Sequence, residues 1–447
     1  MSDNPVTRRD FVKTSVAGAS ALGLMSLSGT NMAFASSGRS MDSIRLGVIG
    51  CGGRGTGAAM NALEASPDVR LVGMADLFTD RIGGARGYLT SNDNPWRDRV
   101  DLPDDRVLTG FDSYQRILEN DLDMVILATT PHFRPMHLRA AVEKGCHVFV
   151  EKPVAVDPAG IRSVLESSAM ADEKGLSIVA GTQRRHETSY REAMARIRDG
   201  AIGRIVTSEA YWNQGGLWMH PRRPEWSDME WQIRNWLYFT WLSGDHIVEQ
   251  HVHNLDVVNW AMSVSSGETH PDKATAVGGR QVRTDPAYGH IYDHFGVLYE
   301  YASGATCMSM CRQQDGTTAR VEEVIRGTRG SFTLRPGAAD LRVAPGSGGG
   351  VGGGEDPWKF VGPNNNPYVQ EHVDLLEAIK SGKRVNEAKQ VAESTLTAIM
   401  GRMAAYTGKT VTWEQALNSK LDLTPPSYEM GPLPTPEVPM PGKTPLI

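Results

Sequence analysis

The stretch IRLGVIGCGGRGTGAAMNALEA, residues 44–65, joins a short apolar run to a glycine-rich turn and a helical pattern. The apolar run predicts a buried strand, and Gly50, Gly52 and Gly55 follow it in G-x-G-x-x-G spacing. Gly50 permits a tight turn, and Gly52 lets the backbone approach a pyrophosphate at the N-terminus of the following helix. A second predicted strand, VRLVGMAD, ends at Asp76. The stretch therefore predicts a dinucleotide-binding turn.

Asp76 indicates which dinucleotide to expect. A carboxylate at the end of the second strand accepts hydrogen bonds from ribose hydroxyls and repels a 2′-phosphate. This favours NAD over NADP as the cofactor, although Arg81 lies close in the sequence and would weaken the preference.

Strands and helices continue to alternate after Asp76. DMVILATTP and CHVFVEKP, which end at Pro131 and Pro153, read as strands, and the residues between them as a helix. This alternation predicts a parallel, doubly wound sheet with its ligand at the carboxyl ends of the strands. The predicted cofactor-binding residues are Gly50, Gly52, Gly53, Arg54, Gly55, Asp76, Thr130, Pro131, Glu151 and Lys152.

The glycine turn, the segment ATTPHFRPMHLRAAVEKGCHVFVEKP and the later GTQRRHETSYREAMARIRDGAIGRIV resemble the Gfo/Idh/MocA family of oxidoreductases. The resemblance covers most of residues 43–410 and implies a Rossmann domain over residues 43–165. It further implies a substrate-binding α/β domain over residues 166–420, built on a large, open, mostly antiparallel sheet. Such proteins oxidise or reduce a C–OH of a sugar, glycoside or cyclitol with a nicotinamide cofactor, and others use NAD to cleave glycosidic bonds.

The segment GDHIVEQHVHNLDVVNW, residues 244–260, can be read in two ways. As a helix capped by Asp245, it places Glu249 and His253 on one face and turns His251 away. As a strand, it aligns Glu249, His251 and His253 like metal ligands. The apolar pattern fits the helix better, so we predict no metal site and a packing or surface role for His251.

The family resemblance assigns chemical roles to this helix. His253 aligns with a histidine that faces nicotinamide and substrate, and Glu249 aligns with an acid that is usually aspartate. Alcohol oxidation needs a base for the hydroxyl proton, and a histidine hydrogen-bonded to a carboxylate suits that task. Lys152 would polarise the same oxygen. We therefore predict Lys152, His253 and Glu249 as catalytic residues.

Six of the ten tryptophans lie within residues 211–241. They either fill an interface or form a lid whose rings stack on sugar faces. The second alternative predicts substrate contacts from this segment and from a tyrosine upstream: Tyr190, Trp212, Asn213, Trp218, His220 and Arg222.

The N-terminus predicts export. The pair Arg8–Arg9, the uncharged run after Lys13 and the A-x-A site at residues 33–35 are typical of a cleavable twin-arginine signal over residues 1–35. We expect a periplasmic protein that meets the twin-arginine translocation machinery and has no membrane anchor.

The composition excludes some classes of binding partner and of covalent cross-link. A net charge of -6 without a long basic run argues against nucleic acid. Cys307 and Cys311 would lie about 13 Å apart in an extended strand, too far to bridge. Residues 345–358 predict a flexible glycine loop, residues 366–383 a helix against the first domain, and residues 421–447 a proline-rich tail over the surface or a neighbouring subunit. We expect a homo-oligomer with a small carbohydrate substrate.

Three functions remain open from the sequence. The first is NAD-dependent oxidation or reduction of a carbohydrate hydroxyl, with a tightly bound, recycled cofactor. The second is NAD-dependent glycoside hydrolysis by oxidation, elimination, hydration and reduction, with Tyr190 as an additional base. The third is a non-catalytic exported sugar-binding protein that retains NAD, against which Lys152 and His253 argue.

Overall fold

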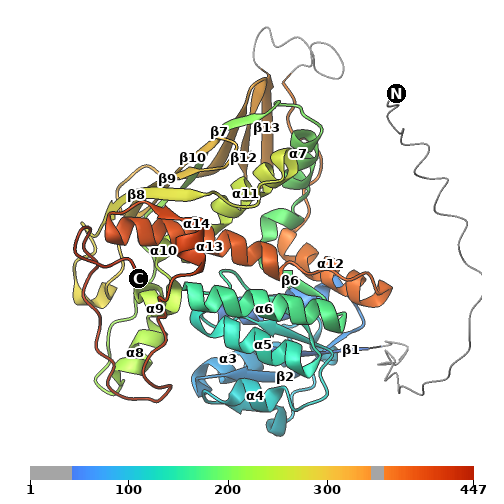
Figure 1. Ribbon diagram of the computed structural model, residues 1–447. Coiled ribbons are helices and arrows are strands. Elements are labelled where there is room, and N and C mark those ends of the chain that lie inside the picture. Colours follow the sequence, from blue (N-terminus) through green and yellow to red (C-terminus); the bar gives the residue numbers. More distant parts are fainter. Residues whose placement is uncertain (1–42, 344–356) are drawn as a thin grey trace, which may run out of the picture. The chain divides into compact units, whose positions relative to one another are not determined.

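The computed structural model describes residues 43–343 and 357–447 (Figure 1). The predicted export signal and most of the predicted glycine loop lie outside the described residues. Within the described ranges the chain forms two β-sheets, and a continuous hydrophobic core includes residues from both.

The first sheet is parallel throughout, with the strand order β3-β2-β1-β4-β5-β6. Its strands are β1 (Ile44–Ile49), β2 (Val69–Asp76), β3 (Val107–Thr109), β4 (Met124–Leu127), β5 (His147–Val150) and β6 (Ile178–Ala180). Its helices are α2 (Gly53–Ala65), α3 (Thr79–Leu89), α4 (Ser113–Ile117), α5 (Arg134–Lys144) and α6 (Pro158–Lys174). This confirms the predicted doubly wound sheet, whose order reverses between β1 and β4 and opens a crevice for a ligand there.

The first sheet extends beyond the boundary predicted at residue 165. That residue lies inside α6, a single helix because the Asp157 side chain caps its start and Gly175 ends it in a left-handed conformation. After α6 the chain returns to the same sheet, where β6 pairs with β5. The parallel sheet therefore ends at Ala180.

The second sheet has the strand order β13-β12-β11-β7-β10-β9-β8-β14. Its strands are β7 (Ile205–Gln214), β8 (Lys273–Gly279), β9 (His294–Glu300), β10 (Thr306–Gln313), β11 (Arg320–Gly327), β12 (Gly330–Arg335), β13 (Ala338–Val343) and β14 (Val411–Thr412). Only β7 and β10 pair in parallel, which confirms the predicted mostly antiparallel sheet. Cys307 and Cys311 lie on β10, buried and free, so the predicted absence of a bridge between them is also confirmed.

Three helices pack against the second sheet: α7 (Thr188–Arg198), α11 (Val252–Ser266) and α13 (Ala388–Thr407). Helix α13 also packs on α6, and Figure 1 shows it between the two sheets. From Ser394 to Thr407 every residue of α13 is buried, as expected for a helix enclosed on all sides. Helix α13 therefore ties the two domains together.

The remaining helices are α8 (Asp228–Arg234), α9 (Thr240–Ser243), α10 (His246–Glu249), α12 (Pro367–Ser381) and α14 (Trp413–Leu417). Helix α12 packs against α2, which confirms the predicted contact with the first domain. None of the helices in the described ranges has the length and apolar character needed to cross a bilayer.

The predicted helix through residues 244–260 forms in two parts. Asp245 caps α10, as predicted, by accepting from the His246 backbone N–H at 2.6 Å. The helix then breaks at Gln250 and His251 before α11 begins, so a single continuous helix is a wrong prediction. Tertiary hydrogen bonds hold the break, because His251 Nε2 lies 2.7 Å from Ser309 Oγ and the Gln250 side chain accepts from strands β7 and β10.

The tail, residues 421–447, runs over the surface of its own chain without forming a helix or strand. The Leu423 and Leu433 N–H groups donate to the Asp157 and Asp228 carboxylates. The Tyr292 hydroxyl donates to the Pro439 carbonyl at 2.9 Å. These contacts fix the tail beside α6 and α8.

Candidate active site

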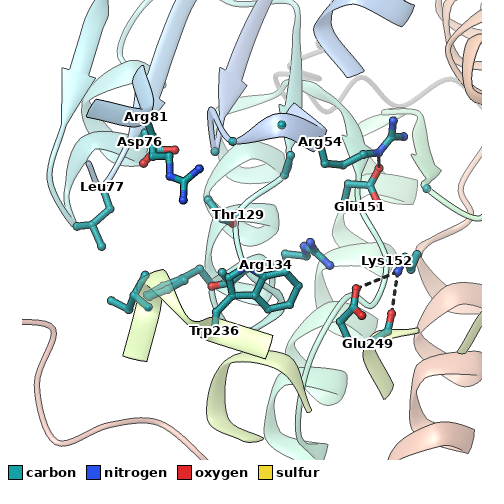
Figure 2. A pocket seen from close by; sticks show the side chains of 18 of the residues that line it. Arg54, Asp76, Leu77, Arg81, Thr129, Arg134, Glu151, Lys152, Trp236 and Glu249 are labelled. Carbon is teal, nitrogen blue, oxygen red and sulfur yellow. Dashed lines mark hydrogen bonds and ion pairs between the residues drawn. The ribbon is translucent and has the colours of Figure 1, made fainter. Parts of the chain in front are cut away.

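A cavity of about 740 Å³ lies at the carboxyl ends of β1, β2, β4 and β5 and is closed on its other side by residues of the second domain (Figure 2). Twelve of the predicted site residues line it: Gly50, Gly52, Gly53, Arg54, Asp76, Thr130, Glu151, Lys152, Trp218, His220, Glu249 and His253. Residues far apart in the sequence thus meet where the strand order predicted a ligand.

The glycine turn has the geometry that a dinucleotide requires. Gly50 has φ +97°, and a Cβ there would lie 2.5 Å from the Thr129 nitrogen. A Cβ on Gly55 would lie 1.8 Å from the Gly50 oxygen, so Gly55 packs inside the turn and does not line the cavity. Gly52 and Gly53 have open space at the Cβ position. A pyrophosphate can therefore approach the backbone at the start of α2.

Asp76 joins the end of β2 to the glycine turn. Its Oδ2 accepts from the Cys51 backbone N–H at 2.6 Å, and its Oδ1 from the Phe78 N–H at 2.9 Å. Burial raises the pKa of this carboxyl, whereas the two N–H donors lower it. Each oxygen keeps a lone pair for a ribose hydroxyl, and Arg81 lines the same end of the cavity.

Lys152 and Glu249 form an ion pair between the domains. Lys152 Nζ donates to the Glu249 backbone oxygen at 2.7 Å and to Glu249 Oε1 at 3.3 Å, as the dashed lines in Figure 2 show. Both side chains are largely buried. Of the three Nζ donors, one remains for a substrate oxygen. Glu249 therefore orients Lys152.

His253 lies at the cavity wall without the expected hydrogen bond to Glu249. The helix break separates the two residues, and the His253 ring instead stacks on Trp212 with a centroid distance of 5.7 Å. Burial, together with the nearby Lys152 cation, holds the imidazole pKa well below its ordinary value of 6.5. The ring is neutral at physiological pH and can accept a proton.

Arg54 fixes Glu151 at the upper edge of the cavity in Figure 2. It forms an ion pair with Glu151 and a longer one, at 3.4 Å, with Glu371 of α12. Its guanidinium also lies 5.0 Å from the centre of the Tyr368 ring. The contact between α2 and α12 is thereby tied to the end of β5.

Several predicted site residues do not line the cavity. Tyr190 is fully buried, and its hydroxyl donates to Glu323 at 3.1 Å. Arg222 forms an ion pair at 2.6 Å with Asp228, the first residue of α8. Trp212 and Asn213 lie on β7, and Pro131 begins a short 3₁₀ turn after β4.

The tryptophan-rich segment is divided between the cavity wall and the packed core. Trp218 and Trp236 line the cavity. Trp231 and Trp241 are buried in an aromatic cluster with Phe133, where packing is their evident role. The segment thus forms one wall of the cavity and the core that supports it.

Two more lining residues, Arg81 and Trp236, were considered in the sequence without being assigned to the site. The other lining residues were not foreseen from the sequence: Leu77, Phe78, Ala128, Thr129, Phe133, Arg134, Gly181, Gln183, Ile233, Arg234 and Tyr368. Thr129 and Arg134 follow β4, so their position at a strand end was a usable signal. Arg234 and Tyr368 reach the cavity only through tertiary packing, which cannot be predicted from a local sequence pattern.

Arg234 of α8 bridges to the first domain over the Asp76 end of the cavity. It binds both carboxylate oxygens of Asp80, at 2.9 and 3.0 Å, and lies 3.9 Å from the centre of the Phe78 ring. Its Nε also donates to Glu230 on its own helix at 2.8 Å. The second domain thereby closes this end of the cavity.

No group of three or more His, Cys, Asp or Glu side chains in residues 43–343 and 357–447 converges in a way that could hold a metal ion.

Comparisons with known proteins agree with this arrangement. A family model described as an oxidoreductase family with an NAD-binding Rossmann fold, Gfo/Idh/MocA, matches residues 44–181. A model of the GFO/IDH/MocA C-terminal domain matches residues 190–333. Together the two models match more than half of the chain.

Two curated relatives are distant. A 2,7-anhydro-N-acetylneuraminate hydratase of Escherichia coli is 25% identical over 227 residues, which are 50% of this chain and 54% of the relative. A glycosyl hydrolase family 109 protein of Streptomyces coelicolor is 25% identical over 288 residues, which are 64% of this chain and 57% of the relative. The matched part of the chain spans little more than half the length of each.

A solved structure shares the fold. Scyllo-inositol dehydrogenase from Lactobacillus casei, with bound NAD(H) and scyllo-inositol, has a TM-score of 0.60 and 17% sequence identity. The similarity covers 83% of this chain and 99% of that chain.

Proposed function

Since the chain belongs to the Gfo/Idh/MocA family of NAD(P)-binding oxidoreductases, we propose that it oxidises or reduces a C–OH group of a sugar, glycoside or cyclitol. One observation carries the proposal: Lys152 from the first domain and His253 from the second line one cavity together with the glycine turn. Oxidation of a C–OH group removes a proton from the oxygen and a hydride from the carbon, so the proton-accepting residues must lie beside the cofactor site.

The residues at the cavity fit a nicotinamide dinucleotide. Gly52, Gly53 and the start of α2 would hold its pyrophosphate, and Asp76 its adenosine ribose. Thr130 and Glu151 lie at strand ends closer to Lys152 and would hold its other half. When bound, the cofactor supplies the hydride acceptor or donor.

His253 and Lys152 have different roles in acid–base catalysis. The neutral His253 imidazole accepts the hydroxyl proton of the substrate. The remaining Lys152 donor binds the same oxygen and stabilises its developing negative charge. Glu249 holds Lys152 in place and keeps a compensating charge beside it.

We propose that the cofactor is NAD and that it stays bound between turnovers. The Asp76 carboxylate disfavours a 2′-phosphate. The predicted twin-arginine signal implies export of the folded protein, where little free NAD is present to refill an empty site. Retention requires a dissociation constant below about 1 μM, or roughly 8 kcal/mol of binding free energy.

Purified protein incubated with a panel of sugars and glycosides tests the function. We expect the denatured protein to release NAD, and one or more sugars to give a keto-sugar with matching reduction of the nicotinamide. Protein that releases no dinucleotide, and oxidises no sugar when NAD is added, would contradict the proposal. Bound NAD without any turnover would instead favour a sugar-binding role.

Similarity to a glycosyl hydrolase family 109 protein favours a second candidate, glycoside cleavage through a keto intermediate. Oxidation acidifies the neighbouring C–H, and a base must then remove that proton. Tyr190 is buried against Glu323, so His253 is the base that the cavity offers. Release of an aglycone without net nicotinamide reduction in the same panel would support this candidate.

A further inference from the structure

Arg134 places a buried guanidinium at the catalytic end of the cavity. It is the first residue of α5, is 6% exposed and lines the cavity close to Lys152 and Glu249, as Figure 2 shows. One nitrogen donates to the Pro153 carbonyl at 2.6 Å. Its Nε has no partner in the described part of the chain. Most of its donors are therefore unused.

The acids near Arg134 are already engaged. Glu151 binds Arg54, and Glu249 binds Lys152. Neither carboxylate, nor any other in the described ranges, forms an ion pair with Arg134. Arg54 also pairs with Glu371, so each of these carboxylates already has a cation, and Arg134 is the cation of this cluster that has no ion-pair partner among the described residues.

Such a charge is costly to bury. Burial lowers the Arg134 pKa to about 10, so the guanidinium remains a cation at neutral pH. A buried cation without an acidic partner destabilises the protein unless a ligand supplies the opposite charge. A guanidinium fork matches a planar carboxylate with two parallel hydrogen bonds.

We propose that Arg134 binds a carboxylate of the substrate, and that the substrate is therefore an acidic sugar of the uronic acid class or its glycoside. This inference rests on the proposed function for the reaction itself. The hydroxyl carbon gives its hydride to the cofactor and the hydroxyl gives its proton to His253, while the carboxylate is unchanged and only positions the ring. The cofactor pyrophosphate is expected at the glycine turn, on the first turn of α2.

The test compares matched sugars that differ only in CH₂OH against COO⁻, such as methyl glucoside and methyl glucuronide, and the galacto and manno pairs. NAD-loaded wild-type protein should bind the acidic member of at least one pair roughly 30-fold more tightly, the scale of a buried charge pair. In Arg134→Gln that ratio should fall to about 1, and Arg134→Lys should restore part of it. The binding of NAD should be unchanged in both variants.

Controls separate this inference from the function. Arg223→Gln removes an exposed arginine outside the cavity and should leave the ratio as in the wild type. Because binding is measured directly, selective binding of the acid without turnover would overturn the proposed function and keep this inference. Equal binding of both members by the wild type, a stronger preference for a sugar 6-phosphate, or an Arg134→Gln variant that loses NAD and keeps the ratio would overturn the inference.

Discussion

His253 illustrates how the surroundings of one residue set its chemistry. Its ring is buried against Trp212 near Lys152, so protonation would place another cation beside Lys152 at a buried position. The neutral ring is thereby favoured, which is the form that a base for alcohol oxidation needs.

This predicts the pH dependence of the reaction. Because the His253 pKa lies well below 6.5, the ring stays unprotonated as the pH falls through 6.5, and its activity as a base is kept. The acidic limb of kcat/KM for sugar oxidation should therefore lie below pH 6.5. A limb at or above the ordinary histidine value would show that burial does not control His253.

For individual residues, the sequence predicted those site residues that occur at a characteristic spacing from a strand or helix. The glycines, Asp76, Lys152 and His253 follow recognisable strands or helices, and the structure brings all of them except Gly55 to the cavity. Arg134 was missed although it follows β4, because its role depends on acids that have other partners. Tyr190 was misplaced because its burial against Glu323 depends on a strand far away in the sequence.

Helix α8 acts through Arg234, which closes the cavity over the expected adenosine site. Replacing Arg234 by Met removes the pair with Asp80 and the contact over Phe78. We expect bound NAD to dissociate roughly three- to tenfold faster, as suits a partly exposed ion pair and a cation–π contact.

Stopped-flow displacement of the bound cofactor measures this rate. Arg326→Met, which removes an ion pair with Glu209 on the second sheet, is a matched control and should leave the rate unchanged. Equal rates in wild type and Arg234→Met would mean that α8 does not hold the cofactor.

A buried histidine, His186, joins the turn before α7 to α12 and to the start of α13. His186 Nδ1 lies 2.6 Å from Asp374 Oδ2, and Nε2 lies 3.5 Å from Glu387 Oε1. Burial alone would lower the His186 pKa, but these acids raise it to about 9. The folded state thus binds a proton that the unfolded chain releases near pH 6.5.

Stability should follow from this difference. The contribution of His186 is fully present below pH 6.5 and is lost as the pH rises through about 9. Denaturant unfolding should therefore show stability falling between pH 6.5 and 9.5 in the wild type. In His186→Gln this part of the pH dependence of stability should be absent. An identical pH dependence in both proteins would show that His186 does not contribute to it.

Element boundaries were predicted less well than element types. The break between α10 and α11 arises from hydrogen bonds of Gln250 and His251 to β7 and β10, which the helical pattern does not encode. The same break separates His253 from Glu249, and Glu249 forms its ion pair with Lys152 instead. A local error in the predicted helix therefore changed the predicted partner of His253, a proposed catalytic residue.

At the scale of the whole molecule, the fold was predicted correctly where strand and helix patterns alternate regularly. Alternating strands and helices predicted the first sheet, and the family resemblance implied the second. The closure of the cavity by the Arg234–Asp80 pair of α8 could not be predicted, because it joins residues that lie far apart in the sequence.

The central claim is that Lys152 and His253 together carry proton transfer during hydride transfer at a sugar carbon. One measurement tests it most directly: the rate of nicotinamide reduction in a single turnover of NAD-loaded protein with a sugar from the reactive panel. Lys152→Ala and His253→Ala should each slow this step about 10²-fold or more while NAD remains bound. His270→Gln, which lies outside the cavity beside Trp413, should keep the wild-type rate. Wild-type rates in both Ala variants, or equal slowing in His270→Gln, would contradict the account.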